Sequence, residues 1–204
     1  MNNEIKKHYQ ELFRKHGNKS ESVQYTDKES QYKRFEILTQ IDRQLNSIVD
    51  VGCGLAHLYD YLNTKGFIGQ YLGLDYVNEF IESCKKKYET VENCTFDHFD
   101  IIKNDIPKKY DYVMLSGVFN NKFVTNKEFM EISIRKMFEA CNKGVAFNAM
   151  STYVDYQDKE LYYSNPIEIF DFCKKNITKK VTLRHDYLVK ENSIPFEYCI
   201  YLYK

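Results

Sequence analysis

The chain has 204 residues, of which 43% are hydrophobic and 28% are charged. This length and composition are typical of one globular domain, so we expect residues 1–204 to form a single unit without room for a second full domain. Lys and Arg together number 29, as do Asp and Glu. This balance argues against nucleic acid or an anionic membrane surface as a partner.

The cysteines and the apolar runs indicate the compartment. The six cysteines include no Cys-x-x-Cys pair, so their spacing favours neither a metal site nor a disulfide framework. Reduced thiols are typical of the cytoplasm. No apolar run approaches the ~18 residues of a membrane span, and the N-terminus lacks the apolar core of a signal peptide. We therefore expect a cytoplasmic protein without a membrane anchor.

Two amphipathic helices are predicted ahead of the first strand. The first covers residues 4–16 and ends at Gly17. The second can be capped by Thr26 or Asp27, and its apolar stripe continues to just before the strand. The residues of this stripe are Tyr32, Phe35, Ile37, Leu38, Ile41 and Leu45.

The rest of the chain is organised around a strand, a glycine turn and a helix start. The β-branched run at residues 48–51 predicts a strand buried on both faces, and a helix is predicted over residues 55–65. Between them, Gly52 and Gly54 have no Cβ, so a ligand can lie against the backbone near the free amides of the helix start. The turn therefore predicts a nucleotide-like ligand.

The residues around the turn narrow the choice of ligand. A dinucleotide fingerprint needs a third glycine where this chain has His57, which disfavours a nicotinamide-dependent oxidoreductase. The carboxylate of Asp50 at the strand end would repel a pyrophosphate and attract a ligand with an ammonium or sulfonium group.

The run Asp50-Val51-Gly52-Cys53-Gly54 resembles the first motif of the class I S-adenosylmethionine-dependent methyltransferases, an acid followed by two glycines at alternate positions. Ala56 stands where many members have a third glycine. The resemblance implies that Asp50, Gly52, Cys53 and Gly54 bind S-adenosylmethionine, which carries both of the expected cations.

A second strand is predicted over residues 70–75, and it ends in an acid. Asp75 follows Gly54 by 21 residues, and a carboxylate at about this separation can accept hydrogen bonds from both ribose hydroxyls of an adenosine. The alternative role of Asp75 is a cap for the helix predicted over residues 77–88. Tyr76 could lay its ring against the adenine.

The next strand begins at Cys94 and leads into a turn that resembles the third motif of the family. The resemblance puts Asp100, in preference to Asp97, at the exocyclic amine of adenine, with the backbone amide of Ile101 beside it. A histidine such as His98 next to a strand end is more often structural than catalytic.

A buried strand from Tyr110 runs into the polar turn 116–121, which resembles the fourth motif of the family. Since the carboxyl ends of parallel strands line one edge of a sheet, we expect Ser116 to face the cofactor and Asn120 to face the acceptor, with Asn121 and Lys122 close by. The Asn-Pro-Pro-Tyr signature of methyltransferases that act on DNA bases is absent. Asn126 is the expected cap of a helix over residues 127–141.

The C-terminal part contributes two further candidates. After a strand over residues 145–150, Tyr153 belongs to a tyrosine-rich loop that could wall off the acceptor, although ordinary packing would also explain the loop. His185 lies beside Asp186 and could act as a general base, with a salt-linked strand end as the alternative. The remaining predicted elements are a helix over residues 167–176 and two strands over residues 181–188 and 196–203.

The whole chain resembles a group of small bacterial methyltransferases. The resemblance implies an α/β, Rossmann-like fold with a seven-stranded, mostly parallel sheet, an antiparallel last strand and helices on both faces. Residues 1–45 would form an N-terminal helical lid that brings Arg34 to the cofactor, and residues 46–204 the core. The expected reaction is methyl transfer to O or N of a small polar metabolite, such as a sugar, by a monomer or homodimer. A non-catalytic module that binds S-adenosylmethionine is the alternative.

Overall fold

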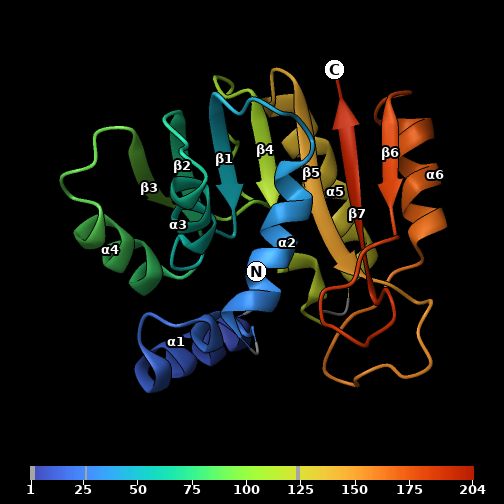
Figure 1. Cartoon of the computed structure of the whole chain (residues 1–204), viewed down its shortest axis with the longest axis horizontal. Helices are drawn as coiled ribbons and strands as arrows, with labels where there is room; N and C mark the ends of the chain where they lie inside the picture. Colours follow the sequence, from blue (N-terminus) through green and yellow to red (C-terminus); the bar gives the residue numbers. More distant parts are fainter. Residues whose placement is uncertain (1–2, 26, 123–124) are drawn as a thin grey trace.

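The computed structural model describes residues 3–25, 27–122 and 125–204. A single sheet runs through the molecule with the strand order β3-β2-β1-β4-β5-β7-β6 (Figure 1). Strands β1 to β5 pair in parallel, and β7 pairs antiparallel with both β5 and β6. The predicted fold class is therefore confirmed, including the antiparallel last strand. The strands are β1 Ser47–Val51, β2 Gln70–Asp75, β3 Cys94–His98, β4 Tyr112–Leu115, β5 Gly144–Met150, β6 Val181–Arg184 and β7 Glu197–Tyr203.

Helices cover both faces of the sheet, because the central strands are apolar on both sides. Alternate residues of β1 point into two separate cores: Ile48 into one, and Val49 and Val51 into the other. The first core is covered by α2 Lys28–Thr39, α3 His57–Thr64 and α4 Asn78–Lys87. The second is covered by α5 Asn126–Ala140 and α6 Pro166–Asn176.

The N-terminal segment divides into two parts with different packing. Helix α2 is a core helix, since Phe35 and Leu38 are buried and the helix packs on β5 and α3. Helix α1 Asn3–His16 and the 3-10 helix η1 Ser20–Val23 instead lie below the edge where the parallel strands end (Figure 1). They pack through Tyr9, Phe13 and Val23 on a small apolar cluster of Leu55, Val77 and Phe80. Of the helices described within the predicted lid of residues 1–45, α2 therefore belongs to the main core, whereas α1 and η1 lie outside it.

The boundaries of two predicted elements are corrected. The second helix ends at Thr39 rather than near Leu45, because the following residues turn back to the sheet, where Asp42 accepts a hydrogen bond from Tyr112. The strand predicted over residues 181–188 ends at Arg184, whose guanidinium pairs with Asp186 at 2.7 Å.

Two predicted helix caps are resolved by the structure. Asp27 caps α2 by accepting from the amide of Ser30 at 2.6 Å, and the alternative cap, Thr26, lies outside the described residues. Asn126 is the first residue of α5 and not its cap. Its side-chain amide donates instead to the carbonyl of Asn121 at 2.7 Å.

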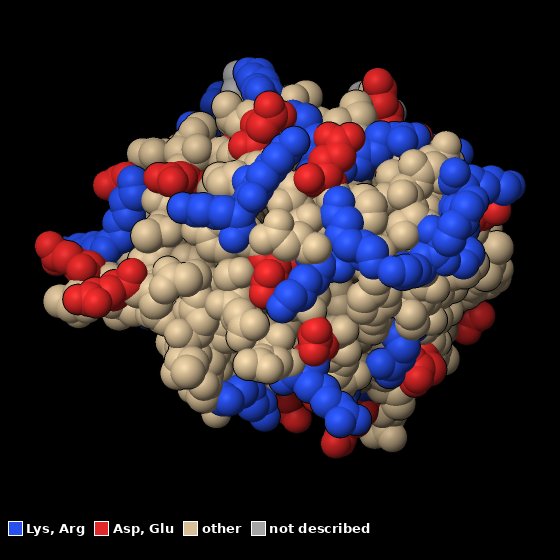
Figure 2. Space-filling view, turned by 90° about the horizontal axis from the view of Figure 1, so that it is seen from above, with Lys and Arg blue, Asp and Glu red and all other residues tan. Residues whose placement is uncertain are grey.

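The opposite edge of the sheet, where the parallel strands begin, carries charges of both signs. Figure 2 views this edge from above and shows many Lys and Arg side chains with Asp and Glu interspersed among them. None of the described helices is long and apolar enough to cross a membrane.

Candidate active site

A cavity of about 300 Å³ opens at the edge where the parallel strands end. Its walls come from the turns after β1, β2 and β4, from the start of β7, and from α2 and η1. The topology therefore brings together segments that are distant in the sequence. Of the residues predicted to contact the cofactor or the acceptor, those that line the cavity are Arg34, Asp50, Gly52, Cys53, Gly54, Asp75, Tyr76, Ile101, Ser116 and Asn120.

The glycine turn is close-packed from two sides. Gly52 and Gly54 have positive φ angles of 74° and 54°, which favour glycine. A Cβ on Gly52 would lie 2.2 Å from Cγ2 of Val118, and one on Gly54 would lie 2.7 Å from Cγ1 of Val23. Ala56, in place of the third glycine, also has a positive φ of 60°, and α3 begins directly after it. The turn thus keeps the backbone geometry of a glycine motif at all three positions.

Asp75 holds the glycine turn and also faces the cavity. Its Oδ2 accepts from the amide of Gly54 at 2.8 Å, and its Oδ1 accepts from the amide of Val77 at 2.8 Å. Burial raises the pKa of Asp75, and these amides counteract the shift. The predicted capping role is wrong, since Val77 is the N-cap of α4 and, within the described chain, no side chain caps this helix. Each carboxylate oxygen of Asp75 has a second lone pair that can accept from a ligand.

Asp50 is the second buried acid of the cavity and is 3% exposed. Its Oδ2 accepts from the hydroxyl of Tyr71 at 2.5 Å. Burial raises the pKa of Asp50 to about 7, because the charged form loses its hydration. Neither Asp50 nor Asp75 forms an ion pair with any residue that the structure describes. This part of the cavity therefore favours a cationic ligand.

The wall of the cavity formed by α2 and the start of β7 contains a closed ion pair. Arg34 on α2 donates from Nε and Nη2 to the carboxylate of Glu197 at 2.6–3.0 Å, and Nη1 donates to the carbonyl of Ser30 at 3.1 Å. The side chain of Glu197 is fully buried and that of Arg34 is 9% exposed. Burial alone would lower the pKa of Arg34, but Glu197 raises it. The ring of Tyr25 lies over the guanidinium at 5.0 Å.

The turn after β4 is fixed by side chains from other elements. The amide of Gly117 donates to Oδ1 of Asn148 at 2.9 Å, and Oδ1 of Asn120 accepts from the amide of Met150 at 3.0 Å. Ser116 shares a hydrogen bond of 3.1 Å with the hydroxyl of Tyr25. Ser116 and Asn120 therefore both line the cavity, but the side-chain oxygen of Asn120 is engaged by the backbone of β5.

The structure does not bring Asp100 to the cavity. Its Oδ1 accepts from the amide of Ile102 at 3.0 Å, so the carboxylate stabilises its own turn, and the neighbours Phe99 and Ile101 line the cavity instead. Tyr76 lines the cavity as predicted and lies 5.8 Å from the ring of His98.

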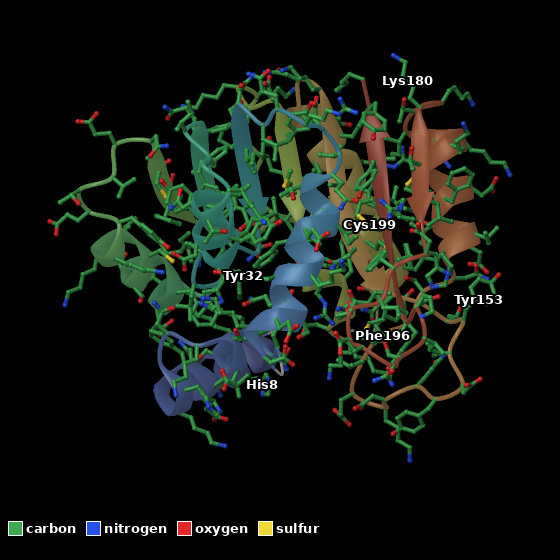
Figure 3. All side chains as sticks on the ribbon, viewed as in Figure 1. His8, Tyr32, Tyr153, Lys180, Phe196 and Cys199 are labelled. Carbon is green, nitrogen blue, oxygen red and sulfur yellow. The ribbon has the colours of Figure 1, made fainter. Side chains whose placement is uncertain are left out.

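His185 and Tyr153 also lie outside the cavity lining. Their rings lie 6.0 Å apart, and Tyr153 is 56% exposed. Figure 3 shows Tyr153 on the loop beside α6, farther from α2 than Phe196, which does line the cavity. The strand ends at Arg184, one residue before His185. Although β6 runs in the same direction as β5, it is the outermost strand and is separated from β5 by β7, so His185 lies to the side of the cavity. Burial lowers the pKa of His185.

Sequence reasoning missed several residues of the site, and three of them form side-chain hydrogen bonds there. Glu197 was treated only as part of a strand, although an acid inside the apolar run Phe196-Glu197-Tyr198-Cys199-Ile200 was a usable signal of a buried charge. Asn148, in the apolar strand β5, carried the same kind of signal. Tyr9, whose hydroxyl donates to Gln24 at 2.8 Å, lines the cavity without any local signal.

Comparisons with known proteins agree with this geometry. The family model "Methyltransferase domain" matches residues 42–187. A protein of Mycobacterium tuberculosis, "Putative methyltransferase Rv1506c", is 33% identical over 154 residues, which cover 72% of this chain and 90% of that protein.

Two solved structures share the fold. The magnesium protoporphyrin IX methyltransferase of Synechocystis PCC 6803, solved with bound S-adenosylmethionine, aligns with a TM-score of 0.64 at 15% identity over 86% of this chain and 80% of that chain. The plantazolicin methyltransferase BpumL aligns with a TM-score of 0.64 at 15% identity over 98% of this chain and 96% of that chain. The chain therefore belongs to the methyltransferase domain family, and it shares the fold of a methyltransferase that was solved with bound S-adenosylmethionine.

Proposed function

We propose that the protein transfers a methyl group from S-adenosylmethionine to an oxygen or nitrogen of a small polar metabolite, with a sugar or related compound as the favoured class. The observation that carries the proposal is the single cavity in which the glycine turn, Asp50, Asp75 and the turn after β4 meet. Two buried carboxylates without an ion-pair partner in the described chain suit a ligand that carries a sulfonium and an ammonium.

Each wall of the cavity has a role in holding the donor. Asp75 accepts hydrogen bonds from the ribose hydroxyls, and Tyr76 and Ile101 enclose the adenine. The backbone of the turn 52–54 contacts the amino-acid part of the cofactor, with Asp50 close to its ammonium. Arg34 faces its carboxylate. These roles use the side chains in the positions they already occupy.

The acceptor is expected beside the turn after β4. S-adenosylmethionine supplies, when bound, a methyl group on a positively charged sulfur. Ser116, Tyr25 and Asn121 offer hydroxyl and amide groups that orient a polar acceptor, and Phe196 and Leu161 exclude water from the same end of the cavity. The enzyme's contribution is therefore alignment in a water-poor cavity. The small volume of the cavity favours a metabolite over a macromolecular substrate.

The proposal is tested by calorimetric titration of the purified protein with S-adenosylmethionine. Asp75→Ala should weaken binding by about tenfold or more, since hydrogen bonds to a charged group contribute about 1.5–3 kcal/mol. Asp97→Ala is the matched control, because Asp97 is an exposed acid on the neighbouring strand β3 that does not line the cavity. Absence of binding by the folded wild-type protein would overturn the proposal.

The acceptor is then sought by following S-adenosylhomocysteine formation with a panel of sugars, phenols and amines. Turnover with one class identifies the acceptor. Tight cofactor binding without turnover on any member of a broad panel would favour the non-catalytic alternative.

A further inference from the structure

The ion pair between Arg34 and Glu197 belongs to a larger hydrogen-bonded network. Asn148 on β5 accepts from the amide of Gly117 at 2.9 Å through Oδ1. The amide nitrogen of the same side chain donates to Oε2 of Glu197 at 3.3 Å. Glu197 in turn holds Arg34 at 2.6–3.0 Å. One buried asparagine thus connects the turn after β4 to the guanidinium on α2.

The network leaves Arg34 with donors to spare. Within the described part of the chain, its hydrogen bonds use Nε, one N–H of Nη2 and one N–H of Nη1. A guanidinium carries a second N–H on each terminal nitrogen. Because Arg34 lines the cavity while Glu197 fixes its orientation, these remaining N–H groups are available to a carboxylate in the cavity.

We propose that Glu197 and Asn148 are positioning residues of the donor site. They fix the guanidinium of Arg34 and the turn at Gly117 in one arrangement, so that the carboxylate in the amino-acid part of the cofactor is bound between them. This inference rests on the proposed function and extends it to residues that do not themselves contact the methyl group. A guanidinium is planar, so its orientation determines whether it can bind a carboxylate through two N–H groups. Residues that hold the guanidinium in place therefore contribute to binding through that orientation.

The test uses two neutral thioethers that differ in the group to be recognised. S-adenosylhomocysteine carries the amino-acid part, and 5′-methylthioadenosine lacks it. Titration of both ligands measures how much affinity the protein gains from that part. In Asn148→Leu, which removes both hydrogen bonds of Asn148, affinity for S-adenosylhomocysteine should fall about tenfold. Affinity for 5′-methylthioadenosine should change by less than about twofold, since the adenosine contacts are untouched.

Asn148→Asp distinguishes the two hydrogen bonds of Asn148, one with Gly117 and one with Glu197. An aspartate at this position still accepts from the amide of Gly117, but it cannot donate to Glu197 and places a like charge beside it. We expect this variant to lose affinity for S-adenosylhomocysteine selectively as well. Ser164→Ala is the matched control: Ser164 shares a buried hydrogen bond of 2.6 Å with Tyr198 on the same strand β7 and lies outside the cavity lining. It should leave both affinities unchanged.

A double variant tests the role of Arg34 without leaving an unpaired buried charge that could unfold the protein. In Arg34→Met/Glu197→Leu both charges are removed, so no unpaired charge is left buried. If this double variant is folded by circular dichroism, its preference for S-adenosylhomocysteine over 5′-methylthioadenosine should shrink by about tenfold, because the carboxylate contact is lost while the ammonium contact of Asp50 remains. Equal losses for both ligands in the Asn148 variants, or no loss for either, would overturn the positioning role. Failure of the wild-type protein to bind either ligand would instead overturn the proposed function.

Discussion

Two parts of the cavity wall differ in how their buried charges are compensated. Near the glycine turn, Asp50 and Asp75 are buried, and among the described residues they receive hydrogen bonds from neutral groups. Between α2 and β7, Glu197 is buried more completely and is paired with Arg34. A charge without an ion-pair partner is costly until a ligand of opposite sign arrives, whereas a paired charge is part of the folded structure itself. The unpaired acids are thus suited to ligand binding, and the ion pair to holding the site together.

The largest effect is expected from removing one charge of the Arg34–Glu197 ion pair. Arg34→Met or Glu197→Leu leaves one buried charge without its partner and should lower the free energy of unfolding by about 3–5 kcal/mol. The double variant should lose much less than the sum of the two. Urea unfolding of all three variants measures this coupling. Additive losses would show that the two charges are independently solvated.

The next effect concerns ligand binding beside the buried acid Asp50. Burial raises the pKa of Asp50 from 3.8 to about 7, and a cationic ligand favours the deprotonated form. Affinity for S-adenosylmethionine should therefore rise with pH below about 7, by at most about tenfold per pH unit, and level off above it. Calorimetry between pH 5.5 and pH 8.5, which is about the range needed to bracket this pKa, follows the change. Asp50→Asn should flatten the profile; an unchanged profile in this variant would assign the titration to another group.

The same acid predicts an effect on stability without ligand. Between the unfolded pKa of 3.8 and the folded pKa of about 7, the folded protein retains a proton that the unfolded chain has lost. Stability should therefore decrease as pH rises through this window, by up to about 1.4 kcal/mol per pH unit. Asp50→Asn should remove this contribution and be more stable than wild type at about pH 8. Denaturant melts at two pH values test the difference, and a less stable variant at that pH would contradict it.

The smallest effect on stability concerns the hydrogen bond between Tyr25 and Ser116. Tyr25→Phe removes the hydrogen bond of 3.1 Å to Ser116 and should cost about 0.5–1.5 kcal/mol of stability. Ser116→Ala should cost a similar amount, and the two together should cost little more than either alone. Thermal unfolding of this double-mutant cycle measures the coupling between the two residues. A strong coupling would show that the segment after η1 and the turn after β4 stabilise each other.

The positions of cavity residues that follow from nearby sequence agree with the structure. The strand, glycine turn and helix around Gly52 and Gly54 follow from β-branched runs and turn residues, and so does the acid at the end of β2. In a parallel sheet every such turn lies at the same edge, so finding the strands was enough to place most of the cavity wall.

Two acids at or beside predicted site residues are held instead by partners two residues away in the chain. Asp100 was assigned to the cofactor, but its carboxylate accepts from an amide two residues away. For His185 beside Asp186 the sequence left two interpretations open, a general base and a salt-linked strand end, and the pairing of Asp186 with Arg184 confirms the salt-linked strand end. In both cases a local hydrogen bond, available before any ligand binds, determines where the side chain lies.

The sequence by itself determined the fold class, the position of the glycine turn and the acid of β2, because each depends on periodicity or spacing within a few tens of residues. Only the tertiary structure decided that α2 is a core helix, and that Arg34 meets Glu197 across 163 residues of chain. Such a pairing has no local signature, since it arises when the antiparallel β7 enters the sheet beside β5 and carries its buried acid under the helix.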